Sequence, residues 1–301
     1  MTDFLQAPYI ADLLHWIHER EVVRLKKESG QPAPWTRDSI IQSTRFCNVH
    51  REDDKVTKWL RKNWYEKHDD SPNLAFSACL ARIVNWPTTL TALGFPSEWS
   101  SARFTTTMTE LSQGGSNKIW GGAYMVTGGY SAGGESKQTI MARVLDRAHE
   151  ECTIFKWVEP VSLESSFNVI KNTPGLGTFL AAQVIADLKY TPLLRSAPDW
   201  QSFCAPGPGS TMGLNFLHGR PPTKGISEKQ FSQEVNELSD WLSTHHGINL
   251  TAHDTQNCLC EFSKYVRIKY LGGRAKTGYL GGSPAPVKSP APSLAQAPKR
   301  H

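Results

Sequence analysis

The sequence predicts a mainly α-helical fold. Several segments repeat apolar residues at helical spacing, and alternating β-branched runs bounded by turns are hard to find. A Gly-Leu-Gly turn also separates two of the helical segments. With 301 residues, the chain is long enough to bury a core without disulfides. We therefore expect one helical domain over residues 1–281, followed by a disordered tail over residues 282–301.

The first half of the chain contains three helical segments and one irregular segment. Residues 8–28 predict an amphipathic opening helix, because apolar side chains recur on one side and charges on the other. Residues 52–67 and 74–93 have helical patterns too, the second interrupted at Pro87, which has no backbone N–H to donate. Residues 112–137 contain four Gly-Gly pairs, and each glycine inside a helix costs ~1 kcal/mol relative to alanine. This segment is expected to be a long functional loop or irregular backbone that a ligand approaches closely.

The helical pattern resumes after the glycine-rich segment. It extends over residues 137–157, 162–171 and 177–189. Residues 282–301 are rich in proline, alanine and serine and have no apolar period. Such a composition cannot bury enough apolar surface to order itself, so we expect a disordered tail.

The glycine turn joins the last two helical segments, at about residues 162–189. Glycine permits positive φ and leaves no side chain above the amides. Gly175, Leu176, Gly177 and Thr178 can therefore direct several N–H groups at one phosphate, directly or through a bound cation. The alternative is that Gly175 only allows a sharp reversal between two helices. The Gly-x-Gly pattern alone does not separate the two interpretations.

The composition excludes several classes of protein. Six scattered cysteines without a CxxC pair argue against zinc ribbons and iron-sulfur clusters, and indicate reduced thiols in a cytoplasmic protein. No apolar run approaches the ~20 residues of a membrane span, and the N-terminal segment has no small-residue cleavage site. The formal net charge of +5 is a mild indication of a polyanionic partner.

Five segments carry a resemblance to known families. The hairpin segment "TPGLGTFLAAQVIADL" resembles the corresponding segment of helix-hairpin-helix DNA glycosylases. Residues 45–60, 81–90, 205–220 and 259–274, in this order, are similar to a helical domain of bacteriophage enzymes. That domain is shared by 5-hydroxymethyluracil DNA kinases and the α-glutamyl/putrescinyl-thymine pyrophosphorylases, also called amino acid:DNA transferases. The resemblance implies a helix-hairpin-helix DNA-glycosylase-like fold with a glycine-rich loop insertion.

The resemblance also implies thymine hypermodification in phage DNA, in the cytoplasm of the infected host. The kinases need a P-loop. The segment of this chain most similar to that motif, "GGYSAGGESK", has no Gly-Lys dipeptide. The transferase branch therefore fits better. Such an enzyme displaces pyrophosphate from 5-(pyrophosphoryloxymethyl)uracil in double-stranded DNA with the amine of an amino acid or polyamine, which protects the genome from restriction. It would flip the base out of the stack and work in partnership with a 5-hydroxymethyluracil DNA kinase.

This chemistry suggests a role for particular residues. Pyrophosphate departure needs cationic stabilisation, and an attacking amine needs a general base. The catalytic candidates are Asp199, Asp187, Glu261, Lys264, Arg51 and Asn48. The candidates for DNA binding are Gly175, Leu176, Gly177, Thr178, Lys137 and Arg82. The "GPGST" turn offers amides and hydroxyls to an anion, so the candidates for pyrophosphate binding are Gly207, Gly209, Ser210 and Arg267.

Several alternatives remain open at this point. The "GPGST" turn can equally be a proline-stiffened bend, and Glu261 with Lys264 can be an ordinary helical salt bridge worth ~0.2–0.5 kcal/mol. One alternative function is a helix-hairpin-helix DNA glycosylase that uses Asp199. The chain lacks the lysine that bifunctional glycosylases have after the hairpin, because Thr178 and Phe179 stand there. Another is a non-catalytic DNA-binding partner of the kinase. No cofactor is evident, and a divalent cation that assists pyrophosphate departure stays open, because no ligand cluster demands one.

Overall fold

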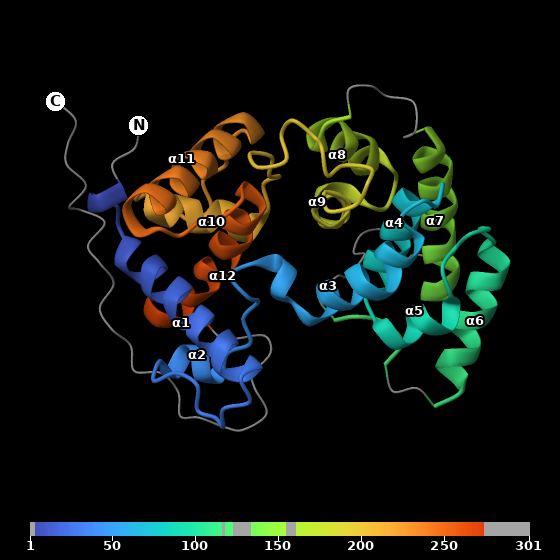
Figure 1. Cartoon of the computed structure of the whole chain (residues 1–301), viewed down its shortest axis with the longest axis horizontal. Coiled ribbons are helices and arrows are strands. Elements are labelled where there is room, and N and C mark those ends of the chain that lie inside the picture. The colour runs from blue at the N-terminus through green and yellow to red at the C-terminus, as the bar shows by residue number, and fades with distance from the viewer. Residues whose placement is uncertain (1–3, 116–117, 123–133, 155–160, 274–301) are drawn as a thin grey trace. The chain divides into compact units, whose positions relative to one another are not determined.

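The computed structural model describes residues 4–115, 118–122, 134–154 and 161–273 (Figure 1). In these residues the chain forms twelve α-helices and four short helical turns, and no strand. The predicted mainly α fold is confirmed. Its likeness to helix-hairpin-helix DNA glycosylases stays a prediction.

The chain folds as two compact units. Unit 1 contains the described residues of Met1–Asp54 and Cys204–His301, and unit 2 contains those of Lys55–Phe203. The predicted boundary of one domain at residue 281 stays a prediction, and the chain inside that boundary is organised as two units. The predicted tail over residues 282–301 lies outside the described residues.

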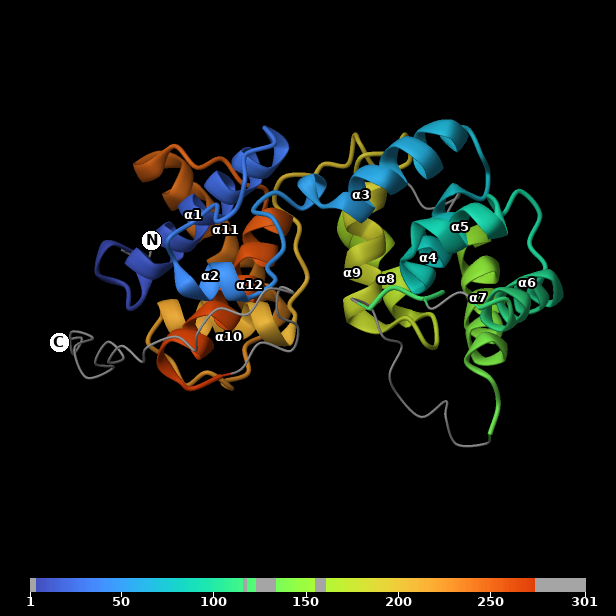
Figure 2. The same ribbon diagram turned by 90° about the horizontal axis from the view of Figure 1, so that it is seen from below.

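Unit 1 is built around its last helix, α12, which packs against α1, α10 and α11 (Figures 1 and 2). Its elements are η1 (Phe4–Gln6), α1 (Ile10–Glu28), α2 (Ser39–Ser43), η2 (Arg51–Asp53), α10 (Pro208–Leu217), α11 (Glu228–His246) and α12 (Ala252–Tyr270). Glycine lets α10 approach α12 closely, because a Cβ on Gly213 would lie 2.2 Å from the carbonyl oxygen of Leu259. Only a residue without a side chain fits there.

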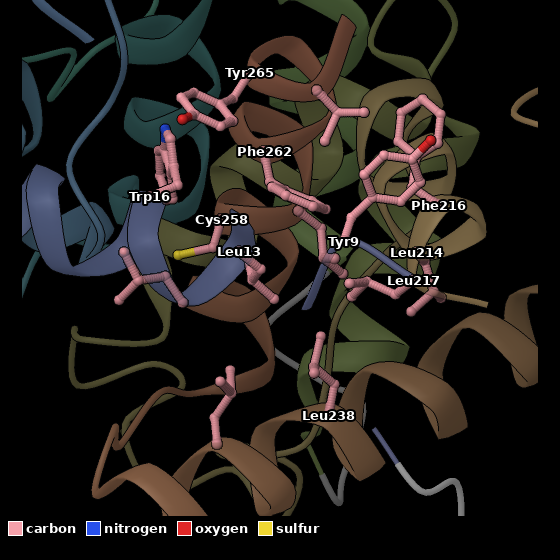
Figure 3. Packing of buried hydrophobic residues seen from close by; sticks show 14 of the residues in the cluster. Tyr9, Leu13, Trp16, Leu214, Phe216, Leu217, Leu238, Cys258, Phe262 and Tyr265 are labelled. Carbon is pink, nitrogen blue, oxygen red and sulfur yellow. The ribbon is translucent and has the colours of Figure 1, made fainter. Parts of the chain in front are cut away.

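The core of unit 1 is one apolar cluster that draws on every long helix of the unit. Figure 3 shows Leu13 and Trp16 from α1 in this cluster with Leu238 from α11 and with Phe262 and Tyr265 from α12. All five side chains are almost completely buried. Removing such side chains from water is the main stabilising contribution to a fold of this kind.

Unit 2 surrounds α4, in which all eleven residues are buried. Helix α4 packs against both α7 and α9, which explains why its sequence is apolar on all sides. The elements are α3 (Lys55–Leu60), η3 (Arg61–Tyr65), η4 (Glu66–His68), α4 (Leu74–Val84), α5 (Pro87–Leu93), α6 (Ser101–Gln113), α7 (Lys137–Ile154), α8 (Leu163–Asn172) and α9 (Gly177–Leu188). The predicted interruption at Pro87 is confirmed, since this proline begins α5 after Asn85 has ended α4 in the left-handed region.

Part of the glycine-rich segment is described, and it lies against the turn between α4 and α5. The amide of Gly121 donates to the carbonyl of Val84 at 2.8 Å, and the hydroxyl of Thr89 donates to the carbonyl of Ile119 at 2.9 Å. The backbone is therefore closely approached at Gly121, as expected for irregular glycine-rich chain, and the neighbour is the protein itself. Residues 116–117 and 123–133 lie outside the described residues.

Candidate functional site

The structure places the Gly-Leu-Gly turn between two packed helices, α8 and α9. Gly175 and Gly177 have φ angles of 98° and 61°, in the left-handed region that favours glycine. A Cβ on Gly175 would lie 2.6 Å from Cγ2 of Val144, whereas a Cβ on Gly177 would have no described atom within 4 Å. Gly175 is thus required for packing on α7, and Gly177 alone has open space beside it.

The start of α9 has the properties of an anion-binding helix end. Leu176 is buried and is the N-cap residue of α9, and it makes no side-chain capping hydrogen bond. Uncapped amides at a helix N-terminus can donate to an anion, and the helix dipole favours negative charge there. Thr178 is half-buried in this first turn. DNA binding by Gly175, Leu176, Gly177 and Thr178 stays a prediction, with Gly177 and Thr178 the better placed.

Asp199 caps the other helix of the turn. Its two carboxylate oxygens accept hydrogen bonds from the amides of Leu163 at 2.7 Å and Glu164 at 2.9 Å, at the start of α8. A carboxylate in this position satisfies free amides and complements the helix dipole. Asp199 is half-buried, so its structural role is evident and its catalytic role stays a prediction.

Asp187 and Arg82 form a buried ion pair in the interior of unit 2. Nε and Nη2 of Arg82 each donate to Asp187 at 2.5 Å, and both side chains are almost completely buried. The hydroxyl of Tyr65 donates to the same carboxylate at 2.8 Å, and the hydroxyl of Thr57 accepts from Arg82 at 3.1 Å. Neither side chain reaches the surface. This burial argues against catalysis by Asp187 and against DNA binding by Arg82.

Glu261 and Lys264 form the helical salt bridge that the sequence left as an alternative. The ammonium of Lys264 lies 2.8 and 3.0 Å from the two carboxylate oxygens of Glu261. Glu261 also accepts from the amide of Cys47 at 3.0 Å, and Lys264 donates to the carbonyl of Arg45 at 3.3 Å. The pair fastens the segment after α2 to α12. Glu261 is buried, while the side chain of Lys264 keeps 32% of its surface exposed.

Asn48 and Arg51 organise the same segment. The side chain of Asn48 donates to the carbonyl of Asp53 at 2.9 Å and accepts from Arg20 at 3.2 Å. Arg51 is buried, and its amide donates to Asp254 at 3.0 Å. The structure therefore brings Asn48 and Arg51 onto the same segment of unit 1 that the Glu261–Lys264 pair holds. Asp187 and Asp199 belong to unit 2.

The predicted pyrophosphate turn is the start of α10. The hydroxyl of Ser210 accepts from the amide of Gly207 at 3.0 Å and from Gln256 at 3.2 Å, and Ser210 is fully buried. A Cβ on Gly209 would lie 2.6 Å from Sγ of Cys260. These contacts account for Gly207, Gly209 and Ser210 by capping and helix packing, so the proline-stiffened bend is the better interpretation. Within the described residues, Nε of Arg267 is buried without a hydrogen-bond partner.

Lys137 begins α7 and is exposed. Its ammonium lies 4.2 Å from the ring centroid of Trp120, and although the residue is exposed, partial desolvation of the ammonium lowers the pKa of Lys137 below its usual value. A surface lysine beside an aromatic ring is suited to a phosphate contact. DNA binding by Lys137 stays a prediction.

His50 and Asp254 form a pair that was not among the residues predicted from the sequence. Nδ1 of His50 lies 3.9 Å from Asp254, whose carboxylate also accepts from the amide of Arg51 and the hydroxyl of Thr251. Burial alone would raise the pKa of Asp254, but these partners lower it to about 2. In turn, Asp254 raises the pKa of His50 against the opposing effect of burial. Thr251 and Asp254 have the spacing of a helix cap, whereas no local pattern marks His50.

The comparison with protein families then decides what the chain is. A family model described as 5-hmdU DNA kinase, helical domain, matches residues 7–272. The chain belongs to this family. The match covers α1 to α12 and therefore spans both units. Membership in the 5-hmdU DNA kinase helical-domain family points to thymine modification in phage DNA and to association with DNA.

Three further findings concern relatives of the chain, membrane spans and metal sites. No curated protein and no solved structure matches the chain. Among the described helices, none is both long and apolar enough to cross a membrane. The described residues also contain no group of three histidine, cysteine or acidic side chains arranged to hold a metal ion.

Proposed function

We propose that the chain is a transferase that acts on modified thymine in double-stranded phage DNA. It would displace pyrophosphate from 5-(pyrophosphoryloxymethyl)uracil with the amine of an amino acid or polyamine, which makes the genome resistant to restriction. The observation that carries the proposal is the family match over residues 7–272, together with the lack of GxxxxGK[ST] in these 301 residues. Without that motif, the 301 residues offer no P-loop for ATP-dependent kinase chemistry.

The start of α9 is the proposed contact with the DNA backbone. A Cβ added to Gly177 would have no described neighbour within 4 Å, and the N-cap residue Leu176 makes no side-chain capping hydrogen bond. A phosphate held there would anchor the strand while the target base leaves the stack, because chemistry at a base requires that it be extruded. Exposed Lys137 in the same unit would add a second phosphate contact.

The proposed chemistry uses the predicted catalytic residues whose side chains reach the surface. These are Lys264, Asp199 and Asn48, each of them only partly buried. Lys264 supplies a cation to the departing pyrophosphate oxygens. In unit 2, Asp199 is a separate candidate among the predicted residues, as general base for an attacking amine, since Asp187 is committed to Arg82. Buried Glu261 and Arg51 would orient Lys264 and the segment around Asn48.

One assay tests the reaction directly. The purified chain is incubated with duplex DNA that carries 5-(pyrophosphoryloxymethyl)uracil and with a panel of amino acids and polyamines, with and without Mg²⁺. The DNA is then digested to nucleosides for mass spectrometry. An amine-bearing thymidine derivative is expected. Release of free base would favour a glycosylase instead, and unchanged DNA that is nevertheless bound would favour a non-catalytic partner of the kinase.

A second assay tests the contact at the start of α9. Gly177→Val should weaken DNA binding and reduce the magnitude of the salt slope by about 0.9, the value for one lost phosphate contact. Gly94→Val is the matched control, because Gly94 has a φ of 72° and likewise no described atom within 4 Å of an added Cβ. Equal binding by the two variants would show that the turn only reverses the chain.

A further inference from the structure

Helix α3 and the turn η3 together have one buried and one charged face. Thr57, Leu60 and Trp64 are almost completely buried and recur at helical spacing. Lys55, Lys58 and Lys62 follow the same spacing two residues earlier and are all exposed. We call the surface defined by these three lysines the lysine face.

The segment that carries the lysine face holds most of the net charge of the chain. Residues 55–67 contain five basic residues and one acid, which gives a net +4, while the whole chain has a formal net charge of +5. The other 288 residues therefore contribute only +1. Three of these basic residues form the lysine face, and positive charges gathered in one segment create a local field that attracts polyanions.

Buried hydrogen bonds tie both ends of this helical segment to α9. The hydroxyl of Tyr65 donates to Asp187 of α9 at 2.8 Å, and Thr57 accepts from Arg82, which is paired with Asp187. On the outer side, the guanidinium of Arg61 lies 4.4 Å from the ring centroid of Tyr190, just beyond α9. Because α9 begins at the Gly-Leu-Gly turn, the lysine face is held at a fixed position relative to that turn.

Two local features suit this surface to a ligand. Arg61–Tyr65 is a π-helical turn, a rare conformation that occurs frequently at functional sites. Trp59 is partly exposed, and its ring centroid lies 6.5 Å from that of buried Trp64, so an aromatic ring is partly accessible on the same segment. From Lys55 to Lys62 the face extends over roughly 10 Å at the rise of an α-helix, whereas duplex DNA carries about one negative charge per 1.7 Å of its axis. The face can therefore meet more than one phosphate.

We infer that the lysine face binds the phosphate backbone of duplex DNA, as a second contact in addition to the start of α9. The inference rests on the proposed function in taking DNA as the substrate. Three exposed lysines on one side of the segment match a backbone of uniform negative charge, and they carry no information about base sequence. The contact should therefore be independent of sequence and of base modification.

The test is the salt dependence of binding to unmodified duplex DNA. The triple variant Lys55→Gln, Lys58→Gln, Lys62→Gln is compared with the wild-type chain between 50 and 200 mM salt. Three lost contacts should reduce the magnitude of the slope of log K against log salt by about 2.7. Over this fourfold change in salt, the wild-type affinity should fall about 40-fold more than that of the variant.

Two matched variants complete the design. Replacing the same three lysines by arginine should retain the wild-type slope, because the positive charges stay. Lys224→Gln with Lys229→Gln, two exposed lysines of unit 1, should also leave the slope unchanged. A triple glutamine variant with the wild-type slope would overturn the inference and direct attention to an acidic protein as the partner. Circular dichroism checks that each variant is folded.

The salt slope of the triple variant and the formation of the amine-bearing nucleoside test the lysine face and the transferase separately. If the slope falls in the triple variant but the wild-type chain forms no amine-bearing nucleoside, the lysine face stands and the transferase fails. If the nucleoside forms and the slope is unchanged, the transferase stands and the lysine face fails.

Discussion

Replacing Asp187 by asparagine should destabilise the chain strongly. The substitution removes the negative charge from a carboxylate that accepts two hydrogen bonds of 2.5 Å from Arg82. The guanidinium would stay in the interior of unit 2 without its counterion, since only 1% of the surface of Arg82 is exposed. Breaking one partner of a buried ion pair typically costs about 3–5 kcal/mol. That loss is comparable with the whole stability of a marginal domain.

Urea unfolding followed by circular dichroism measures this loss. The free energy of unfolding of Asp187→Asn is expected to fall by about 3–5 kcal/mol. The double variant Arg82→Met with Asp187→Leu is the control, because it removes both charges and leaves no orphaned cation. It should recover a large part of the stability, since apolar replacement of a buried pair is often neutral. If Asp187→Asn unfolds within about 1 kcal/mol of the wild type but forms no product, the structural interpretation of Asp187 is refuted.

Three further outcomes follow from individual contacts. Asp254→Asn should cost about 2 kcal/mol at pH 6, because the folded pKa of about 2 lies below the unfolded value of 3.8. In urea titrations at several pH values, this difference from the wild type should disappear as the pH falls from about 4 to 2; a constant difference would contradict the assignment. Gly213→Ala should lower the thermal midpoint, at a cost of about 1–3 kcal/mol from overpacking against Leu259, whereas Gly225→Ala, with open space, should not. Asp199→Ala should cost about 1 kcal/mol as a lost helix cap. Retained nucleoside formation by that variant would exclude Asp199 as the general base.

Local patterns in the sequence were sufficient to place several helices and the turn between α8 and α9, although they did not place α6, α10 or α11. Periodicity is a local property, so the spacing of Leu163, Phe167 and Ile170 was sufficient to place α8, and two glycines marked the start of α9. Pro87 likewise marked the beginning of α5, because proline lacks the backbone N–H that a helix interior needs. Each of these signals depends on neighbours within a few residues.

The roles of the charged and small residues depend on contacts between segments far apart in the chain. Asp187 meets Arg82 across 105 residues, and Glu261 meets the amide of Cys47 across 214. No local pattern specifies such partners, because they are set by how the helices pack. Gly209 shows the same limit: its sequence suits an anion-binding turn, yet the neighbouring thiol of Cys260 leaves room only for a glycine. The spacing of apolar residues along the chain determines which faces of the helices are apolar. The packing of the helices determines which polar groups come together and which remain exposed to a ligand.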